Sequence, residues 1–366
     1  MDVVTGEKTY YYARAVRESK KKCGPEAIHF EKNKYKAVTL PYYFVQNNKL
    51  YFILFGGTFS YVYILLFVYF MSKKSMFGIN DCKAPRKNFT FKRGRRPVKR
   101  GKKYDFKTVI LFPHNLGQTK LGVEEAPKYL SKFVDKHVKM VPSTGNLFKN
   151  LHNLYIANEN SNGKIINIGG DHSMAIPTIA DSLNKYPNVK VIYFDAHADI
   201  NTYASSNSKH YHGMPLSFVT GLDKDKHFGF IKNLLPFQNL LYVGSRCWDD
   251  FEVAEIFKEK IKFLTPNDIN NHFNASVQKI LTFIGSSPIH ISFDVDSIDP
   301  KYIPSTGTPV KKGIRLKNAI NLLDILNSNS NIVKLDITEL NVKLGSKMDG
   351  EKSGINTEKL FHKFLQ

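Results

Sequence analysis

The chain has 366 residues, of which 42% are hydrophobic, and a formal net charge of +21. A chain of this length and apolar content can bury a substantial core, which excludes a wholly disordered chain. It is long enough for two domains or for one large domain with an extension. Residues 1–104 hold 23 Lys and Arg against 6 Asp and Glu, whereas residues 105–366 hold 30 against 26, so the second part is nearly neutral and the charge does not indicate a nucleic-acid-binding enzyme.

Residues 1–104 form a basic N-terminal extension with one long apolar segment. Leu50–Met71 carries no charged residue, and about 20 apolar residues are enough for a helix to span a bilayer. Two interpretations stay open. The segment is either a membrane anchor or part of an over-extended reading frame, in which case Met71 or Met76 would start the protein.

A basic run, Arg93–Lys103, follows the apolar segment. Such a run is suited to anionic lipid, to nucleic acid or to nuclear import. No aromatic nucleic-acid-binding motif accompanies it, so we favour a solvated linker and expect no nucleic-acid partner.

The three cysteines, Cys23, Cys82 and Cys247, are far apart and include no CxxC spacing. This usage favours a reducing compartment and argues against a disulfide framework or a thiolate zinc site. We therefore expect the catalytic part to be cytoplasmic, with membrane attachment through residues 50–71 left open.

After Tyr104, short apolar runs alternate with longer mixed segments. Nearly continuous apolar runs are typical of parallel strands that are covered on both faces. Eight such runs predict strands: Val109–Phe112, Val138–Pro142, Ile165–Ile168, Val189–Phe194, Leu240–Val243, Ile261–Leu264, Ile289–Val295 and Ile332–Ile337. A helix is predicted over Glu124–His137, where apolar residues recur at helical spacing. The pattern predicts one α/β domain over residues 105–366, with three α/β/α layers and an eight-stranded, mainly parallel sheet.

Acids and histidines directly follow three of these strands. The segments are Gly169-Gly170-Asp171-His172-Ser173, Asp195-Ala196-His197-Ala198-Asp199 and Asp294-Val295-Asp296-Ser297-Ile298-Asp299-Pro300. Parallel strands deliver such side chains to one crevice. Like charges cannot gather there without cations. Each segment alone is also compatible with a polar turn or a helix N-cap, but the three together predict a metal site.

Alternation at period two predicts that the acids and histidine of residues 195–199 share one face, as do the acids of residues 294–296. Two imidazoles and four carboxylates suit a pair of divalent ions, with Mn²⁺ the best match. Two such ions can share a water and lower its pKa, which makes it a nucleophile at neutral pH.

As a set, the three segments resemble the signature motifs of the ureohydrolase superfamily, which includes the arginases and agmatinases. Gly117-Gln118 and Leu121–Pro127 are similar to the family's first loop and helix, and the resemblance covers about residues 107–345. It implies an arginase-like fold and two Mn²⁺ ions per subunit. Asp195 and Asp294 would bridge the ions. The first ion would be held by His172, Asp195, Asp199 and Asp294, and the second by Asp195, His197, Asp294 and Asp296. Asp171 and Asp299 would support the ligands.

The segments after Asp199 are most similar to arginases. The resemblance implies that Asn201 and Ser208 contact a substrate α-carboxylate and that Asp249 and Glu252 lie near its α-amino group. Thr308 and Glu339 match positions that border the guanidinium, and His212 matches the family's proton-transfer histidine.

The resemblance therefore implies hydrolysis of L-arginine to L-ornithine and urea by attack of a metal-bridging hydroxide. Asp199, His212 and Glu339 would carry the catalysis, in a homo-oligomer that the family suggests is a trimer or hexamer. Two alternatives stay open. One is a ureohydrolase acting on agmatine, guanidinobutyrate or formiminoglutamate, and the other is a non-catalytic regulatory member of the family.

Overall fold

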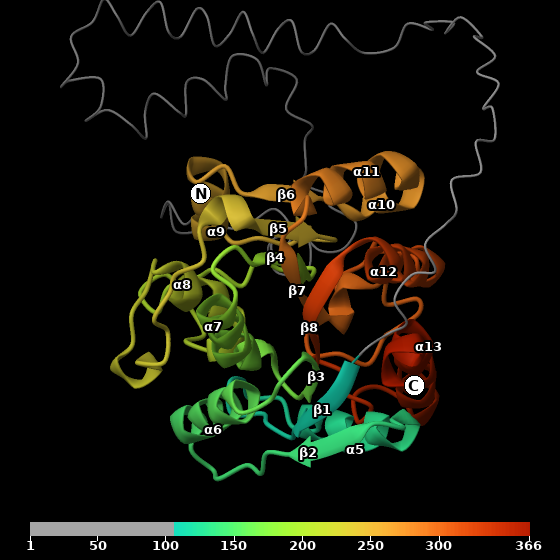
Figure 1. The fold of residues 1–366 in the computed structure, drawn as a ribbon. Helices are drawn as coiled ribbons and strands as arrows, with labels where there is room; N and C mark the ends of the chain where they lie inside the picture. Colours follow the sequence, from blue (N-terminus) through green and yellow to red (C-terminus); the bar gives the residue numbers. More distant parts are fainter. Residues whose placement is uncertain (1–105) are drawn as a thin grey trace, which may run out of the picture. The chain divides into compact units, whose positions relative to one another are not determined.

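An eight-stranded sheet runs through residues 106–366, which are the residues that this computed structural model describes (Figure 1). The strand order is β2-β1-β3-β8-β7-β4-β5-β6, and every neighbouring pair is parallel. The strands are β1 (Phe106–Phe112), β2 (His137–Met140), β3 (Lys164–Gly169), β4 (Lys190–Phe194), β5 (Leu240–Val243), β6 (Lys262–Leu264), β7 (Pro288–Asp294) and β8 (Asn331–Thr338). All eight predicted strands are confirmed.

Helices cover both faces of the sheet, which confirms the predicted three layers (Figure 1). One face packs against α6 (Leu147–Glu159), α7 (Ala175–Lys185), α8 (Pro215–Thr220) and α9 (Asp250–Lys258). The other packs against α5 (Ala126–Leu130), α10 (Pro266–Asn271), α11 (Phe273–Ile284), α12 (Leu316–Asn329) and α13 (Lys347–Leu365).

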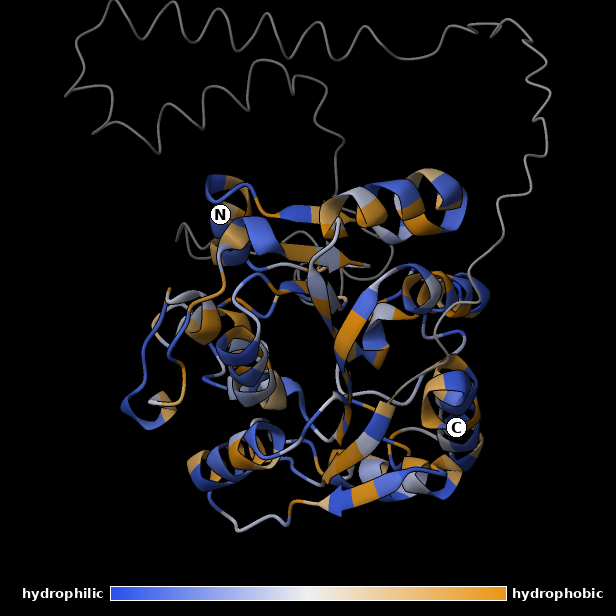
Figure 2. Cartoon of the chain, in the orientation of Figure 1, coloured by the Kyte–Doolittle hydropathy of each residue, from blue (hydrophilic) through white to orange (hydrophobic). Residues whose placement is uncertain are grey.

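The central strands are buried on both faces, of which one is apolar and the other partly polar, as at His290 and Ser292 of β7. In β4 every residue after Lys190 is buried, and in β7 every residue after Pro288 is buried. Figure 2 shows the hydrophobic residues along the strands and on the helix faces that meet them. Burial of these side chains, at about 25 cal/mol per Å² of apolar surface, drives the layers together.

The helix predicted over residues 124–137 is wrong in extent. A 3-10 turn at Val123–Glu125, the short helix α5 and a second 3-10 turn at Ser131–Phe133 take its place. Val134 is extended, and His137 already pairs with β1, so strand pairing ends the helical run early. Strand β2 also stops at Met140, two residues before Pro142, whose missing N–H could not join the ladder.

Within residues 106–366, no helix combines the length and the apolar character that crossing a membrane would require. The apolar segment 50–71 and the basic run 93–103 lie outside the described residues, as does the predicted boundary at residue 105.

Candidate metal centre and substrate site

The three acidic segments meet at the carboxyl ends of β3, β7 and β4. The residue after β3 is Gly170, where a Cβ atom would lie 1.8 Å from the carbonyl oxygen of His114. The N–H of Asp171 donates to that same oxygen at 3.0 Å. Only glycine permits this close approach of two backbones, so Gly170 fixes where the His172 loop begins.

The first group of possible ligands comprises His172, Asp195 and Asp199. The Nδ1 atom of His172 lies 3.0 Å from Asp195 Oδ2 and 3.2 Å from Asp199 Oδ2. All three residues are buried, and one ligand atom of each lies within 4.8 Å of the others. This is a spacing that one metal ion could fill.

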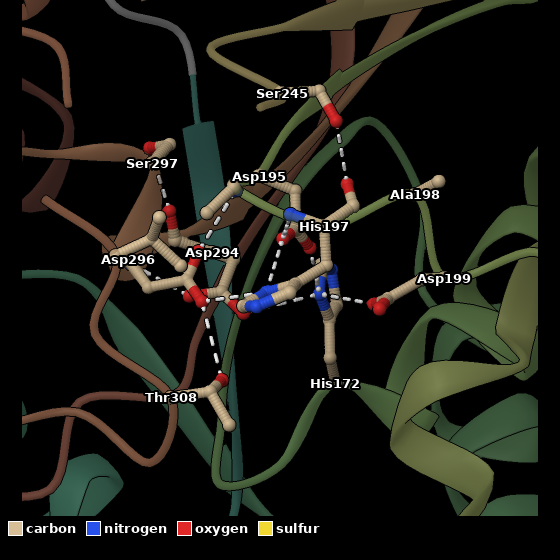
Figure 3. Close-up of polar contacts among 12 residues, drawn as sticks. His172, Asp195, His197, Ala198, Asp199, Ser245, Asp294, Asp296, Ser297 and Thr308 are labelled. Carbon is tan, nitrogen blue, oxygen red and sulfur yellow. Dashed lines mark hydrogen bonds and ion pairs between the residues drawn. The ribbon is translucent and has the colours of Figure 1, made fainter. Parts of the chain in front are cut away.

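The second group comprises Asp195, His197 and Asp296 (Figure 3). The Nδ1 atom of His197 lies 3.0 Å from Asp296 Oδ2 and 3.4 Å from Asp195 Oδ1. Asp195 therefore belongs to both groups and offers a different oxygen to each. The side chain of His197 is 25% exposed, so this group faces the open side of the centre.

Asp294 completes the predicted set at the end of β7. Its Oδ2 atom lies 3.5 Å from His172 Nδ1, and its Oδ1 atom accepts a 2.7 Å hydrogen bond from the N–H of Asp296. The structure thus brings all six predicted ligands to one place.

Without a bound cation, burial and repulsion among the carboxylates shift the pKa values of the predicted ligands. Burial, together with the neighbouring carboxylates of Asp199 and Asp296, raises the pKa of Asp195 to about 7. Burial and the charges of Asp296 and Asp195 raise the pKa of Asp294 well above its ordinary value. Burial opposes ionisation of Asp296 too, but the charge and hydrogen bond of His197 lower its pKa to about 2.

These residues fit a pair of divalent cations. Asp195 Oδ2 is buried and accepts no hydrogen bond from the described residues when His172 Nδ1, 3.0 Å away, carries no proton, and a buried carboxylate oxygen needs a partner. A cation between the two groups would supply one and would offset the repulsion among the acids. A mixed set of imidazole and carboxylate donors suits divalent transition-metal ions.

The ligands converge by a different route from the one that the period-two alternation predicted. Asp199 lies in a loop after β4 with a left-handed φ of 51°. Asp296 lies in a 3-10 turn, Val295–Ser297, after the end of β7. The segments are therefore not extended strands, and loop geometry turns the side chains toward one another.

Two buried hydroxyls support the first group, and sequence analysis identified neither. Ser292 Oγ lies 2.9 Å from His172 Nε2. Tyr193 donates its hydroxyl proton to Asp199 Oδ2 at 2.9 Å, and its ring stacks on that of His172. A signal was present: both are polar residues inside apolar strands, two positions before Asp294 and Asp195, and thus on the same strand face.

Asp171 and Asp299 lie outside both ligand groups, as expected of supporting acids. Asp171 accepts hydrogen bonds from the N–H groups of Gly117 and Ser173, at 2.9 and 3.0 Å. Asp299 accepts from the N–H groups of Lys301 and Gly313, both at 2.9 Å. Each acid holds a loop beside the candidate metal centre.

Glu339 joins His212 beside the ligands. Its Oε1 atom lies 3.2 Å from His212 Nδ1 and accepts the N–H of His172 at 2.9 Å, while Oε2 accepts the amide of Gln118 at 2.8 Å. Burial disfavours a charged imidazole, but the hydrogen bond and charge of Glu339 raise the pKa of His212 to about 9. Gln118 was noted in sequence only as part of a motif.

The predicted substrate residues lie in two places beside the candidate metal centre. Thr308 lies on the side of Asp296, with its hydroxyl 3.4 Å from Asp296 Oδ2 (Figure 3). Asn201 donates its amide to Asp249 Oδ2 at 2.9 Å, which places the predicted carboxylate and amino contacts side by side.

The two remaining substrate candidates differ in exposure. Ser208 is exposed, and its hydroxyl accepts the N–H of His210 at 3.3 Å. Glu252 is only 4% exposed, and its two oxygens accept the N–H groups of Asp249 and Ile200. Glu252 therefore contacts the predicted amino site through the backbone of Asp249.

Residues 108–362 match the family model described as the arginase family. The arginase of Entamoeba histolytica is 33% identical over 276 residues, which are 67% of this chain and 93% of that protein. The arginase of Neurospora crassa is 40% identical over 197 residues, which are 50% of this chain and 55% of that protein.

Solved structures agree with this match. The crystal structure of Entamoeba histolytica arginase in complex with L-ornithine superposes with a TM-score of 0.64 at 31% identity, covering 71% of this chain and 98% of that one. An arginase structure from Bacillus subtilis gives a TM-score of 0.64 at 26% identity, with the same coverage.

Proposed function

The chain belongs to the arginase family, whose members are hydrolases of guanidino and amidino substrates, and we propose that it hydrolyses L-arginine to L-ornithine and urea. The observation that carries the proposal is the pair of ligand groups that share Asp195 at the carboxyl ends of β3, β4 and β7. The resemblance to arginases over most of the described residues favours arginine over other guanidino compounds.

In this proposal, two Mn²⁺ ions occupy the two groups. His172, Asp195, Asp199 and Asp294 would hold the first ion, and Asp195, His197, Asp294 and Asp296 the second. When bound, such a pair lowers the pKa of a water enough to attack the guanidinium carbon and stabilises the charge that develops.

The side chains around the ions have separate tasks. Asp199 orients the attacking water and passes a proton to the leaving amine. Glu339 and Thr308 border the planar guanidinium, whose fork of N–H donors suits a carboxylate. His212, on the partly exposed side of Glu339, exchanges protons with solvent.

The residues that recognise the amino acid end of the substrate lie beside the ligand groups. Asn201 and Ser208 donate to the α-carboxylate, and Asp249 accepts from the α-ammonium. Glu252 keeps Asp249 in place by accepting its N–H at 2.9 Å. A decarboxylated substrate such as agmatine would leave the donors of Asn201 and Ser208 unused.

The test is urea release by the full chain after Mn²⁺ loading, with L-arginine and agmatine measured in parallel. We expect turnover of arginine and little of agmatine. The control is Asp195→Ala, which removes the ligand common to both groups and should abolish urea release. The proposal is wrong if the Mn²⁺-loaded protein releases no urea from arginine, or releases it faster from agmatine.

A further inference from the structure

Tyr193 is a buried residue beneath the candidate metal centre. It lies on β4, two positions before Asp195, and its side chain is fully buried. A buried phenol hydroxyl needs a hydrogen-bond partner. Its oxygen lies 2.9 Å from Asp199 Oδ2 and 3.1 Å from His172 Nδ1, and thus between two predicted ligands of one ion.

The hydroxyl has one proton to give, and the geometry decides its acceptor. His172 can bind a cation through Nδ1 only if its other nitrogen, Nε2, carries the ring proton. The position of Ser292 Oγ, 2.9 Å from Nε2, suits that arrangement because the oxygen can accept the proton. The proton of Tyr193 then goes to Asp199 Oδ2, and Nδ1 keeps its lone pair for the ion.

The ring of Tyr193 restrains His172 as well. The two rings stack with centroids 4.6 Å apart and planes inclined by 9°. Stacking and the hydrogen bond to Ser292 together fix the plane of the imidazole, and hence the direction in which Nδ1 points.

Asp199 needs such support because its backbone is unusual. Its φ of 51° lies in the left-handed region, which few residues other than glycine adopt. A hydrogen bond from the N–H of Leu216 to its carbonyl, at 3.0 Å, holds its backbone. The hydroxyl of Tyr193 holds its carboxylate.

We propose that Tyr193 is a positioning residue for the metal centre, which holds the carboxylate of Asp199 and the imidazole of His172 in the geometry that binds one of the two ions. The proposal rests on the proposed function only in taking these two residues as metal ligands. It assigns Tyr193 an effect on metal affinity that a residue of the packed core would not have.

The sheet supplies a matched control in Tyr242. It is the direct partner of Tyr193 on the neighbouring strand β5, and it is also fully buried. Its hydroxyl donates to the backbone carbonyl of Ala198 at 2.8 Å. Tyr242→Phe therefore removes the same atom from the same row of the sheet, but it removes no bond to a predicted ligand side chain.

The experiment titrates Mn²⁺ into the metal-free full chain by isothermal titration calorimetry, for the wild type, Tyr193→Phe and Tyr242→Phe. We expect Tyr193→Phe to weaken one of two sites by about 10–100-fold, the usual effect of losing a partner of a metal ligand. Tyr242→Phe should bind both ions as the wild type does. Equal Mn²⁺ affinity in Tyr193→Phe and the wild type, or equal weakening in both variants, overturns the proposal.

A second measurement separates positioning from damage to the fold. In an Asp199→Ala background the acceptor of the Tyr193 hydroxyl is gone, so adding Tyr193→Phe should cause much less than its own loss of Mn²⁺ affinity. Fully additive losses would contradict the proposal. Urea release is not the readout, so wild-type protein that binds two ions without hydrolysing arginine would refute the proposed function and leave this inference standing.

Discussion

Glu339 links three parts of the candidate site through one carboxylate. Its backbone φ of 64° is left-handed, a conformation that costs a non-glycine residue about 1–3 kcal/mol. The strain places its oxygens where they accept from His172, Gln118 and His212 at once. The side chain of Glu339 therefore fixes the relative positions of the His172 loop, the Gln118 loop and His212.

The link between Glu339 and His212 predicts a pH-dependent stability in the metal-free protein. Burial disfavours the charged imidazole, yet Glu339 raises the pKa of His212 to about 9, against about 6.5 in an unfolded chain. The charged pair thus stabilises the fold fully below pH 6.5, and this contribution of about 3 kcal/mol is lost as the pH rises through about 9. In Glu339→Gln the loss over this range should shrink by more than half.

Urea unfolding of the metal-free proteins at pH 6 and pH 9.5 checks this prediction. Glu358→Gln, which removes the partner of His362 on the surface of α13, is the control and should keep the wild-type pH dependence. If the unfolding free energy of Glu339→Gln differed between the two pH values by as much as that of the wild type, Glu339 would not be what raises the pKa of His212.

The sequence identified the ligand candidates because their residue types are rare in apolar surroundings. It did not identify the contacts of Gln118 and Ser292, whose partners lie 221 and 120 positions away in the chain. Amides and hydroxyls of this kind occur in every loop and strand, so only the fold distinguishes the few that meet a ligand.

Among the elements, α9 links the stability of the fold to the predicted substrate residues Asn201 and Asp249. It begins with a capping box, in which Glu252 accepts the N–H of Asp249 and the side chain of Asp249 accepts an N–H in return. The second oxygen of Glu252 accepts the N–H of Ile200, next to Asn201. One buried acid therefore fixes both predicted contacts for the amino acid end of the substrate.

Glu252→Ala should therefore affect folding and substrate binding together. It leaves two N–H groups without their acceptor, and we expect a loss of about 1–3 kcal/mol in unfolding free energy. Loosening Asp249 and Asn201 should raise KM for arginine more than it lowers kcat. Urea unfolding and steady-state kinetics of the Mn²⁺-loaded protein measure the two effects.

The matched control is Ser346→Ala, which breaks the capping box of α13 far along the chain from these residues. It should reduce stability without changing KM. If both variants left KM unchanged, Glu252 would be a helix cap with no influence on substrate binding.

Strands were easier to predict than helices in this chain for a physical reason. Most of the strands are apolar runs that are buried on both faces, and β5 was predicted to the residue. Residues 124–137 have helical spacing, but pairing of His137 with β1 ends the helix first. Tertiary contacts of this kind decide element ends and are not visible in a local pattern.

Across the whole molecule, polar residues form a buried row behind the metal centre. Neighbouring strands place Asn167, Asp336, Ser292, Tyr193 and Tyr242 side by side across β3, β8, β7, β4 and β5. Their hydroxyls and carboxylate bond to α7, to His172 and to the loop after β4. Within this row only Ser292 and Tyr193 bond to predicted ligand side chains, and it took the strand order to show that they lie side by side.

Removal of the metal should lower the stability of the whole domain. Without cations, the buried acids Asp195, Asp294 and Asp296 lie close together, and their charges are offset only in part by the imidazoles and Arg246. Metal that binds the folded state alone stabilises it by about 2.7 kcal/mol per site at 100 times Kd. For a domain of this size we expect Mn²⁺ to raise the Tm of the chelated protein by at least about 5 °C.

Thermal unfolding of the chelated protein over a series of Mn²⁺ concentrations measures this gain, and Tm should continue to rise after the sites fill, as mass action requires. Asp195→Ala takes one oxygen from each ligand group, so its Tm should respond far less to Mn²⁺. Mg²⁺ at the same concentrations is the second control, because a centre built from two imidazoles should prefer Mn²⁺. Equal shifts with both ions would mean that the acids bind any divalent charge, and no shift with either would mean that the six residues do not form a metal centre.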